Sequence, residues 1–122
     1  MSYETKDLGV SGEGFAEKYL ECAGYKILAR NYRIRSAEID LIAERDGVIA
    51  FIEVKARRTK KYGRPSEAVT VRKQRKIISA ASVFMQGEEY AGRACRFDVI
   101  EVYAVGDEWA LNHIENAFEV NG

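Results

Sequence analysis

Residues 37–57, AEIDLIAERDGVIAFIEVKAR, form two apolar stretches joined by Asp46-Gly47, and this segment decides the fold. Asp-Gly between alternating hydrophobic runs is a strong signal for a β-hairpin with a two-residue turn. A turn at 46 and 47 gives a register that places Asp40 directly opposite Glu53. Two carboxylates that face each other across a ladder repel and destabilise it. The pair therefore predicts a positive group between them, and a divalent metal ion is the first candidate.

Side chains of the hairpin alternate between two faces. One face is apolar and is expected to pack on a helix; it carries Ile39, Leu41, Ala43, Ala50, Ile52 and Val54. The other face gathers its charges at the end away from the turn, where Glu38 lies opposite Lys55 beside Asp40 and Glu53. Glu38 is predicted to hold Lys55 in place, although an ordinary cross-strand ion pair explains these two residues equally well. Close carboxylates should raise at least one pKa without metal, which favours a functional site.

Oxygen ligands beside a lysine are typical of a Mg²⁺ or Mn²⁺ site that acts on phosphate. Asp40 and Glu53 are the predicted ligands, with the Val54 carbonyl as a further candidate. The reaction that fits is phosphodiester hydrolysis, in which the metal polarises the scissile phosphate. Lys55 is predicted to orient the attacking water or to stabilise charge on the phosphate. Glu13, beside the apolar stripe of the first helix, is either a further group that reaches the ion, directly or through water, or an exposed helix residue.

The composition indicates one globular domain over residues 1–122. Cys22 and Cys95 fall in apolar segments and are expected to be buried free thiols, with no disulfide framework or zinc site. No basic start precedes an apolar run, and no apolar stretch reaches 18 residues, so secretion and membrane spanning are not expected. The cytoplasm is the expected compartment.

The formal charge is zero, but residues 55–76 contain ten basic side chains and one acid. A dense positive segment in a neutral protein favours a polyanionic partner, and DNA is the prediction. The predicted contacts to backbone phosphates are Arg57, Arg58, Lys60, Lys61, Arg64, Arg72, Lys73 and Lys76. Runs of this kind also occur on solvated loops and helix faces, so the charge alone does not decide the matter.

Apolar spacing predicts a helix from Leu8 that ends at Gly24. Thr70 is the expected N-cap of a second helix, which ends at Gly87. The expected strands are 25–33, 34–45, 48–57, 96–105 and 109–114. The strand, helix and strand between 48 and 105 predict a parallel crossover. The fold class is therefore α/β (α+β), in the order α-β-β-β-α-β-β, with one mixed sheet flanked by helices.

Several motifs follow one another in a fixed order. They are Gly12-Glu13, Gly24-Tyr25, Arg30-Asn31-Tyr32, Glu38-Ile39-Asp40-Leu41-Ile42, Glu53-Val54-Lys55, Glu67-Ala68-Val69-Thr70, Arg96-Phe97-Asp98-Val99 and Asn116-Ala117-Phe118. With these motifs the chain resembles the YraN family of small bacterial proteins. Asp40 with Glu53-Val54-Lys55 resembles the PD-(D/E)XK nuclease superfamily. The resemblance implies a restriction-endonuclease-like core, an acid of the first helix at Glu13, metal ligands at Asp40 and Glu53, and the lysine at Lys55.

Three functions follow from these patterns. The YraN family is described as related to archaeal Holliday junction resolvases, which implies a homodimer that acts on DNA. The first hypothesis is therefore a Mg²⁺-dependent endonuclease for DNA, branched or otherwise structured. The second is a nucleic-acid-binding module with the same fold and little catalysis, and the third is an interaction domain that binds an acidic protein. The opposed carboxylate pair favours the first hypothesis, because the other two do not require it.

Overall fold

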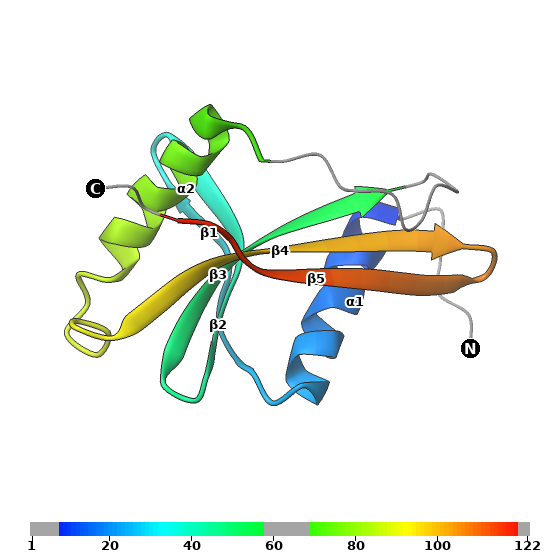
Figure 1. Cartoon of the computed structure of the whole chain (residues 1–122), viewed down its shortest axis with the longest axis horizontal. Coiled ribbons are helices and arrows are strands. Elements are labelled where there is room, and N and C mark those ends of the chain that lie inside the picture. The colour runs from blue at the N-terminus through cyan, green and yellow to red at the C-terminus, as the bar shows by residue number, and fades with distance from the viewer. Residues whose placement is uncertain (1–7, 58–68, 120–122) are drawn as a thin grey trace.

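The computed structural model describes residues 8–57 and 69–119. Along the chain the elements are α1 (Leu8–Cys22), β1 (Lys26–Ile34), β2 (Ala37–Arg45), β3 (Val48–Arg57), α2 (Val71–Phe84), β4 (Ala94–Val105) and β5 (Glu108–Phe118). Their spatial order in one sheet is β1-β2-β3-β4-β5. Only β3 and β4 are parallel neighbours, joined through α2. The predicted element order and mixed sheet are confirmed, and Figure 1 shows the sheet between its helices.

Local chemistry explains the turn and the second helix. Asp46 and Gly47 both have positive φ, 53° and 81°, as a type I′ hairpin turn requires. Thr70 caps α2 as predicted, because its Oγ1 accepts a hydrogen bond from the Lys73 backbone N–H at 3.1 Å. The helix ends at Phe84, three residues before the predicted stop at Gly87.

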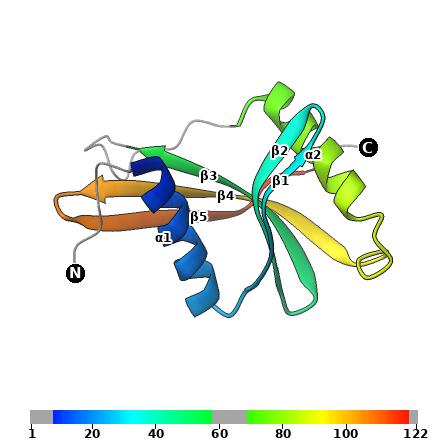
Figure 2. The same ribbon diagram turned by 180° about the vertical axis from the view of Figure 1, so that it is seen from behind.

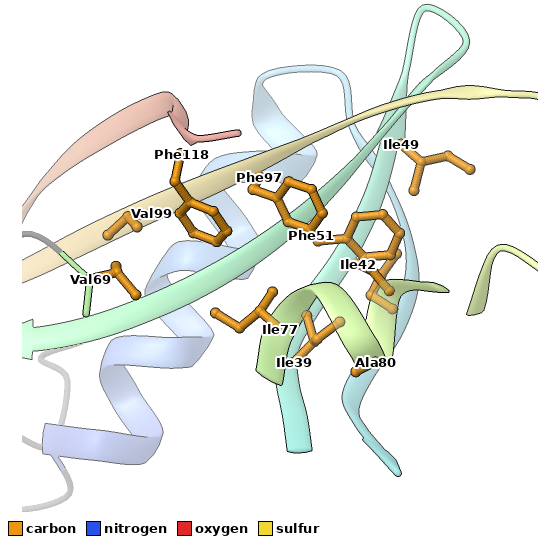
Figure 3. Close-up of a cluster of buried hydrophobic side chains, with 11 residues drawn as sticks. Ile39, Ile42, Ile49, Phe51, Val69, Ile77, Ala80, Phe97, Val99 and Phe118 are labelled. Atoms are coloured by element: carbon orange, nitrogen blue, oxygen red, sulfur yellow. The ribbon is translucent and has the colours of Figure 1, made fainter. Parts of the chain in front are cut away.

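One hydrophobic core lies between α2 and the sheet, as Figure 3 shows. The helix contributes Ile77, Ala80 and Ala81, and the sheet contributes stacked rings of Phe51 and Phe97. Burial of side chains of this size contributes about 1.5–3 kcal/mol each. This core fixes α2 over β1 and β2 and thereby places its first turn near the predicted site.

A second core lies between α1 and the opposite face of the sheet. Ala16 and Leu20 of α1 are fully buried, and they pack with Leu41, Ile52 and their neighbours on the sheet. α1 packs tightly against the sheet at Gly12, where a Cβ would lie 2.9 Å from Val102 Cγ2 and 3.6 Å from Ala56 Cβ. The absence of a side chain at this position is what allows the N-terminal half of α1 to lie against β3 and β4.

The prediction that Ile39 shares the apolar hairpin face with Leu41 is wrong. Leu41, Ala43, Ala50 and Ile52 pack under α1, whereas Ile39 belongs to the core under α2. The pairing of β1 with β2 keeps one register from Tyr32–Ile39 to Arg30–Leu41, but Asn31 and Asp40 between these pairs are not ladder partners, and Asn31 has a φ of 50°. A left-handed residue interrupts the regular pleat. The two faces of β2 therefore exchange at Asp40.

The prediction that both cysteines are buried is also wrong. Cys22 and Cys95 are free thiols, as expected, but both are exposed. Cys22 is the last residue of α1, and Cys95 precedes the buried part of β4, which begins at Phe97. Apolar neighbours in the sequence therefore did not imply burial at the ends of these elements. None of the helices in residues 8–57 and 69–119 is long and apolar enough to cross a membrane.

Candidate functional site

The site forms where β2 and β3 separate. Their pairing follows the predicted register from Arg45–Val48 to Leu41–Ile52 and ends there. Beyond this point β2 stays beside β1, and β3 stays beside β4, so the two strands diverge, as Figures 1 and 2 show. Asp40 lies at the opening, and its Oδ2 accepts a hydrogen bond from the Val54 backbone N–H at 2.8 Å. The carboxylate thereby takes the place of the ladder partner that Val54 has lost.

The expected ladder pair of Asp40 with Glu53 does not form, because the β2–β3 pairing ends one step before it, at Leu41–Ile52. Glu53 instead follows Ile52 on the β3 side of the opening. Its side chain is 13% exposed, and Oε2 lies 3.6 Å from Nζ of Lys73 on α2. Burial raises the pKa of Glu53, the charge of Asp40 raises it further, and Lys73 and Lys55 oppose the rise. Burial also raises the pKa of Asp40, against the hydrogen bond from Val54 and the charge of Lys73. The two carboxylates therefore lie within electrostatic reach of each other and of the same ammonium group.

Glu13 approaches from the α1 side. Burial raises its pKa, and the charges of Asp40 and Glu38 raise it further, so Glu13 lies on the same side of the molecule as the predicted pair. Its position follows from the preceding residue, because Gly12 sets the close contact between α1 and the sheet. The structure therefore brings Glu13 toward the opening, although no hydrogen bond joins the acids.

Lys55 follows Glu53 by two residues on β3 and is half-buried, so both side chains leave the same face of the strand. The expected contact between Lys55 and Glu38 is replaced by another. Glu38 Oε2 pairs with Nη2 of Arg33 at 3.2 Å, because β2 follows β1 at this point and not β3. The prediction that Glu38 lies opposite Lys55 is therefore wrong, because the β2–β3 ladder ends before it reaches either residue.

The donor set at the opening fits a hard divalent cation. Asp40 and Glu53 lie within electrostatic reach of each other, Asp40 is held by the Val54 backbone N–H, and Lys73 already supplies positive charge at Glu53. A contact from the Val54 carbonyl stays a prediction. Mg²⁺ keeps several waters and is commonly held by one or two carboxylates, so this set is sufficient. Among the described side chains, no three His, Cys, Asp or Glu groups converge tightly enough to hold an ion. A contact from Glu13 is therefore expected to pass through water.

The predicted phosphate-binding residues divide into four groups. Arg58, Lys60, Lys61 and Arg64 lie outside the described residues. Arg57 turns inward, with Nη2 3.8 Å from Oε2 of the buried Glu101. Arg72 is exposed on the first turn of α2, whereas Lys73 and Lys76 line a groove beside the site.

That groove has a volume of about 300 Å³. It lies between the β1–β2 turn and the first turns of α2, and it is lined by Arg33, Ile34, Arg35, Ser36, Ala37, Glu38, Lys73 and Lys76. Sequence reasoning missed Arg33 and Arg35. The available signal was two arginines just before the Glu38-Ile39-Asp40 run; Arg33 lies near the end of β1, and Arg35 lies in the turn that leads to β2.

Sequence reasoning also missed a buried polar network on the α1 side. The Asp98 side chain is fully buried, and its oxygens bind His113 Nε2 at 2.8 Å, Arg96 Nε at 3.0 Å and the Asn116 backbone N–H at 3.0 Å. His113 Nδ1 hydrogen-bonds the Tyr19 hydroxyl at 2.8 Å. Burial alone would raise the pKa of Asp98, but these bonds outweigh it and hold the pKa below its usual value. The network attaches α1 to β4 and β5.

The chain was compared with known proteins. The profile of the "Uncharacterised protein family UPF0102" matches residues 12–102. A UPF0102 protein of Symbiobacterium thermophilum is 45% identical over 115 residues, which are 93% of this chain and 98% of that protein. A UPF0102 protein of Prosthecochloris aestuarii is 44% identical over 124 residues, covering 97% and 98% of the two chains.

Among solved structures, Pyrococcus furiosus SfsA in complex with Ca²⁺ is similar, with a TM-score of 0.41 and 18% identity. The match covers 96% of this chain but 66% of the SfsA chain, just under two thirds of its length. A likeness this distant says nothing about what the present chain binds.

Proposed function

We propose that this chain, which belongs to protein family UPF0102, is a Mg²⁺-dependent endonuclease that hydrolyses phosphodiester bonds of DNA. The family is the one that the sequence motifs predicted under the name YraN. The observation that carries the proposal is the opening between β2 and β3, where Asp40 and Glu53 are held near each other and near a lysine.

The roles of the residues follow from their positions. Asp40 and Glu53 would hold the ion, and Asp40 is fixed for this by its bond to the Val54 N–H. When bound, the ion would polarise the phosphate and lower the pKa of a water. Lys55 would stabilise charge on the phosphate from the neighbouring position on β3. Glu13 would hold a water from the α1 side.

Half-burial of the two carboxylates suits this chemistry. Burial raises both pKa values because a charged carboxylate loses solvation there. A bound divalent cation would neutralise the two neighbouring carboxylates. The arrangement therefore favours the cation-bound state over the state with two unpaired negative charges. DNA is the proposed substrate because basic side chains gather beside the same opening. The homodimer and the preference for branched DNA stay predictions.

A second candidate is a nucleic-acid-binding module without catalysis. The ion pair between Lys73 and Glu53 favours it, because this contact already neutralises one of the two carboxylates. Such a module would bind DNA in a salt-dependent way, and Lys55→Ala would leave that binding unchanged.

The experiment is cleavage of linear, flapped and four-way-junction DNA with Mg²⁺ and with Mn²⁺. Loss of an outer contact to a metal site typically costs 10–100-fold, so loss of a ligand in Asp40→Asn or Glu53→Gln should lower the rate by about 100-fold or more. Glu108→Gln removes an exposed acid at the start of β5 and should leave the rate unchanged. Circular dichroism verifies the fold of each variant. DNA binding without cleavage under any condition would support the second candidate instead.

A further inference from the structure

The groove beside the site is strongly positive. Four basic side chains line it, Arg33, Arg35, Lys73 and Lys76, against the single carboxylate of Glu38. That carboxylate is already paired with Arg33. The groove therefore keeps an excess of positive charge that no side chain in its own lining balances.

Helix α2 adds to this potential. Its first turns border the groove, and its first turn contains no acidic residue. The N-terminus of a 14-residue helix carries a partial positive charge from its unpaired N–H groups. Basic side chains at this end are unfavourable for the helix itself, and a bound anion would offset the mismatch.

Lys73 connects the groove to the carboxylates. It lines the groove, and its Nζ lies 3.6 Å from Glu53 Oε2. The side chain of Lys73 is 46% exposed, whereas that of Glu53 is 13% exposed. The ammonium group can therefore rotate toward an anion in the groove, while the carboxylate stays in place.

We propose that this groove binds the phosphate backbone of one nucleic-acid strand, and that a bound phosphate draws Lys73 away from Glu53 and so favours binding of a divalent cation there. The inference rests on the proposed function and deepens it, since it names the strand path and couples substrate to metal. Backbone phosphates are recognised by charge and carry no sequence information, which matches a groove of lysines and arginines.

The coupling has a simple physical origin. In the free protein a cation must compete with the Lys73 ammonium for Glu53. A phosphate that engages Lys73 removes the competitor, so each ligand favours the other. Linkage is reciprocal, and coupling between two sites typically changes affinity by 5–150-fold. Nucleic acid and metal should therefore bind with positive cooperativity.

The test measures Mn²⁺ affinity by electron paramagnetic resonance, with and without a short oligothymidylate that is checked to be intact afterwards. For the parent chain, the oligonucleotide should tighten Mn²⁺ binding by about 5-fold or more. Lys73→Gln should bind Mn²⁺ more tightly by itself, and the oligonucleotide should no longer change that affinity. Lys73→Arg keeps the positive charge and should retain the coupling.

Two control variants separate the groove from general charge. Lys76 lines the groove, but the proposed coupling does not pass through it. Lys76→Gln should therefore weaken oligonucleotide binding and keep the coupling between oligonucleotide and Mn²⁺. Arg75→Gln removes the same charge from the same helix outside the groove and should have a smaller effect on binding.

The outcomes distinguish this inference from the proposed function. The inference would be overturned if Mn²⁺ and the oligonucleotide both bind but do so independently. It would also be overturned if Lys73→Gln preserves their coupling. Either result would leave the metal site intact. No Mn²⁺ binding to the parent chain in either condition would overturn the proposed function itself. Inorganic phosphate is compared with the oligonucleotide at equal phosphate concentration. If it tightens Mn²⁺ binding as much, the assignment of the groove to a nucleic-acid backbone is refuted.

Discussion

Gly12 sets the distance between α1 and the sheet, and Gly12→Ala tests this role. A Cβ at this position would lie 2.9 Å from Val102 Cγ2, which belongs to a fully buried, β-branched side chain on β4. Val102 has little freedom to move, because χ1 of valine is restricted. Forcing an extra methyl into a packed core costs about 1–3 kcal/mol. The better helix propensity of alanine returns about 0.5–1 kcal/mol, so we expect a net loss of about 0–2.5 kcal/mol, centred on about 1 kcal/mol.

Gly14→Ala is the matched control on the same helix. A Cβ at Gly14 would meet no atom within 4 Å, and the residue is exposed. Only the propensity term remains, so this variant should gain about 0.5–1 kcal/mol of unfolding free energy. The two substitutions are identical in chemistry and differ only in what the methyl group meets.

Urea unfolding measures both effects. With a slope of about 1.5 kcal/mol/M, the midpoint should fall by about 0.7 M in Gly12→Ala and rise by about 0.5 M in Gly14→Ala. Equal stabilisation of the two variants would refute the reasoning, because it would mean that α1 does not approach the sheet at Gly12. Displacement of α1 in Gly12→Ala should also move Glu13 away from the opening.

Three further predictions concern buried and exposed groups. The pKa of Asp98 in the folded protein lies below its ordinary value of 3.8. The ionised carboxylate therefore stabilises the fold above pH 3.8, and this stabilisation is lost as the pH falls through the folded pKa. In Asp98→Asn, the unfolding free energy should consequently depend less on pH on the acid side. Arg57→Ala leaves Glu101 as a buried carboxylate without its cation. The unfolding free energy measured in urea should therefore fall by about 1–3 kcal/mol. Adding Glu101→Gln to the same chain should restore part of this loss. Ellman's reagent should label Cys22 and Cys95 in the native protein because both residues are exposed. Partial desolvation of the Cys95 thiol raises its pKa, so labelling of Cys95 should accelerate toward alkaline pH. Native protein without reactive thiols would contradict this prediction.

The hairpin register was predictable because its determinants are local. Asp46 and Gly47 adopt the two positive φ values that their residue types favour, and the apolar alternation then fixes the pairing up to Leu41–Ile52. The divergence beyond this pair was not predictable. It depends on β1 and β4, which hold β2 and β3 on opposite sides, and β4 lies far from the hairpin in the sequence.

The candidate site shows the same division. Asp40 and Glu53 were predicted together because one short hairpin contains both. Lys73 was predicted only as a phosphate contact, because nothing in the sequence relates a residue of α2 to a carboxylate on β3. Ile39 was assigned to the wrong face because the left-handed conformation of Asn31, which follows the Arg30–Leu41 pair and precedes the Tyr32–Ile39 pair on β1, has no counterpart in the period-two pattern.

Two buried acids on β4 were missed for a related reason. Asp98 and Glu101 stand in a strand whose other residues are mostly apolar, so the pattern predicts a strand without indicating how its charges are satisfied. Their partners come from β3, from β5 and from β4 itself, and only the folded chain brings the β3 and β5 partners to them. A charged residue inside an apolar strand is a signal for a buried network, but it does not name the partners.

A crystal structure of the protein grown with Mn²⁺ would show whether Asp40 and Glu53 together hold one divalent cation. We expect an anomalous difference peak between the two carboxylates, bonded to one oxygen of each, with the Lys73 ammonium moved from Glu53 toward the groove. A peak elsewhere at saturating Mn²⁺, with Lys73 still in contact with Glu53, would rule out this metal site.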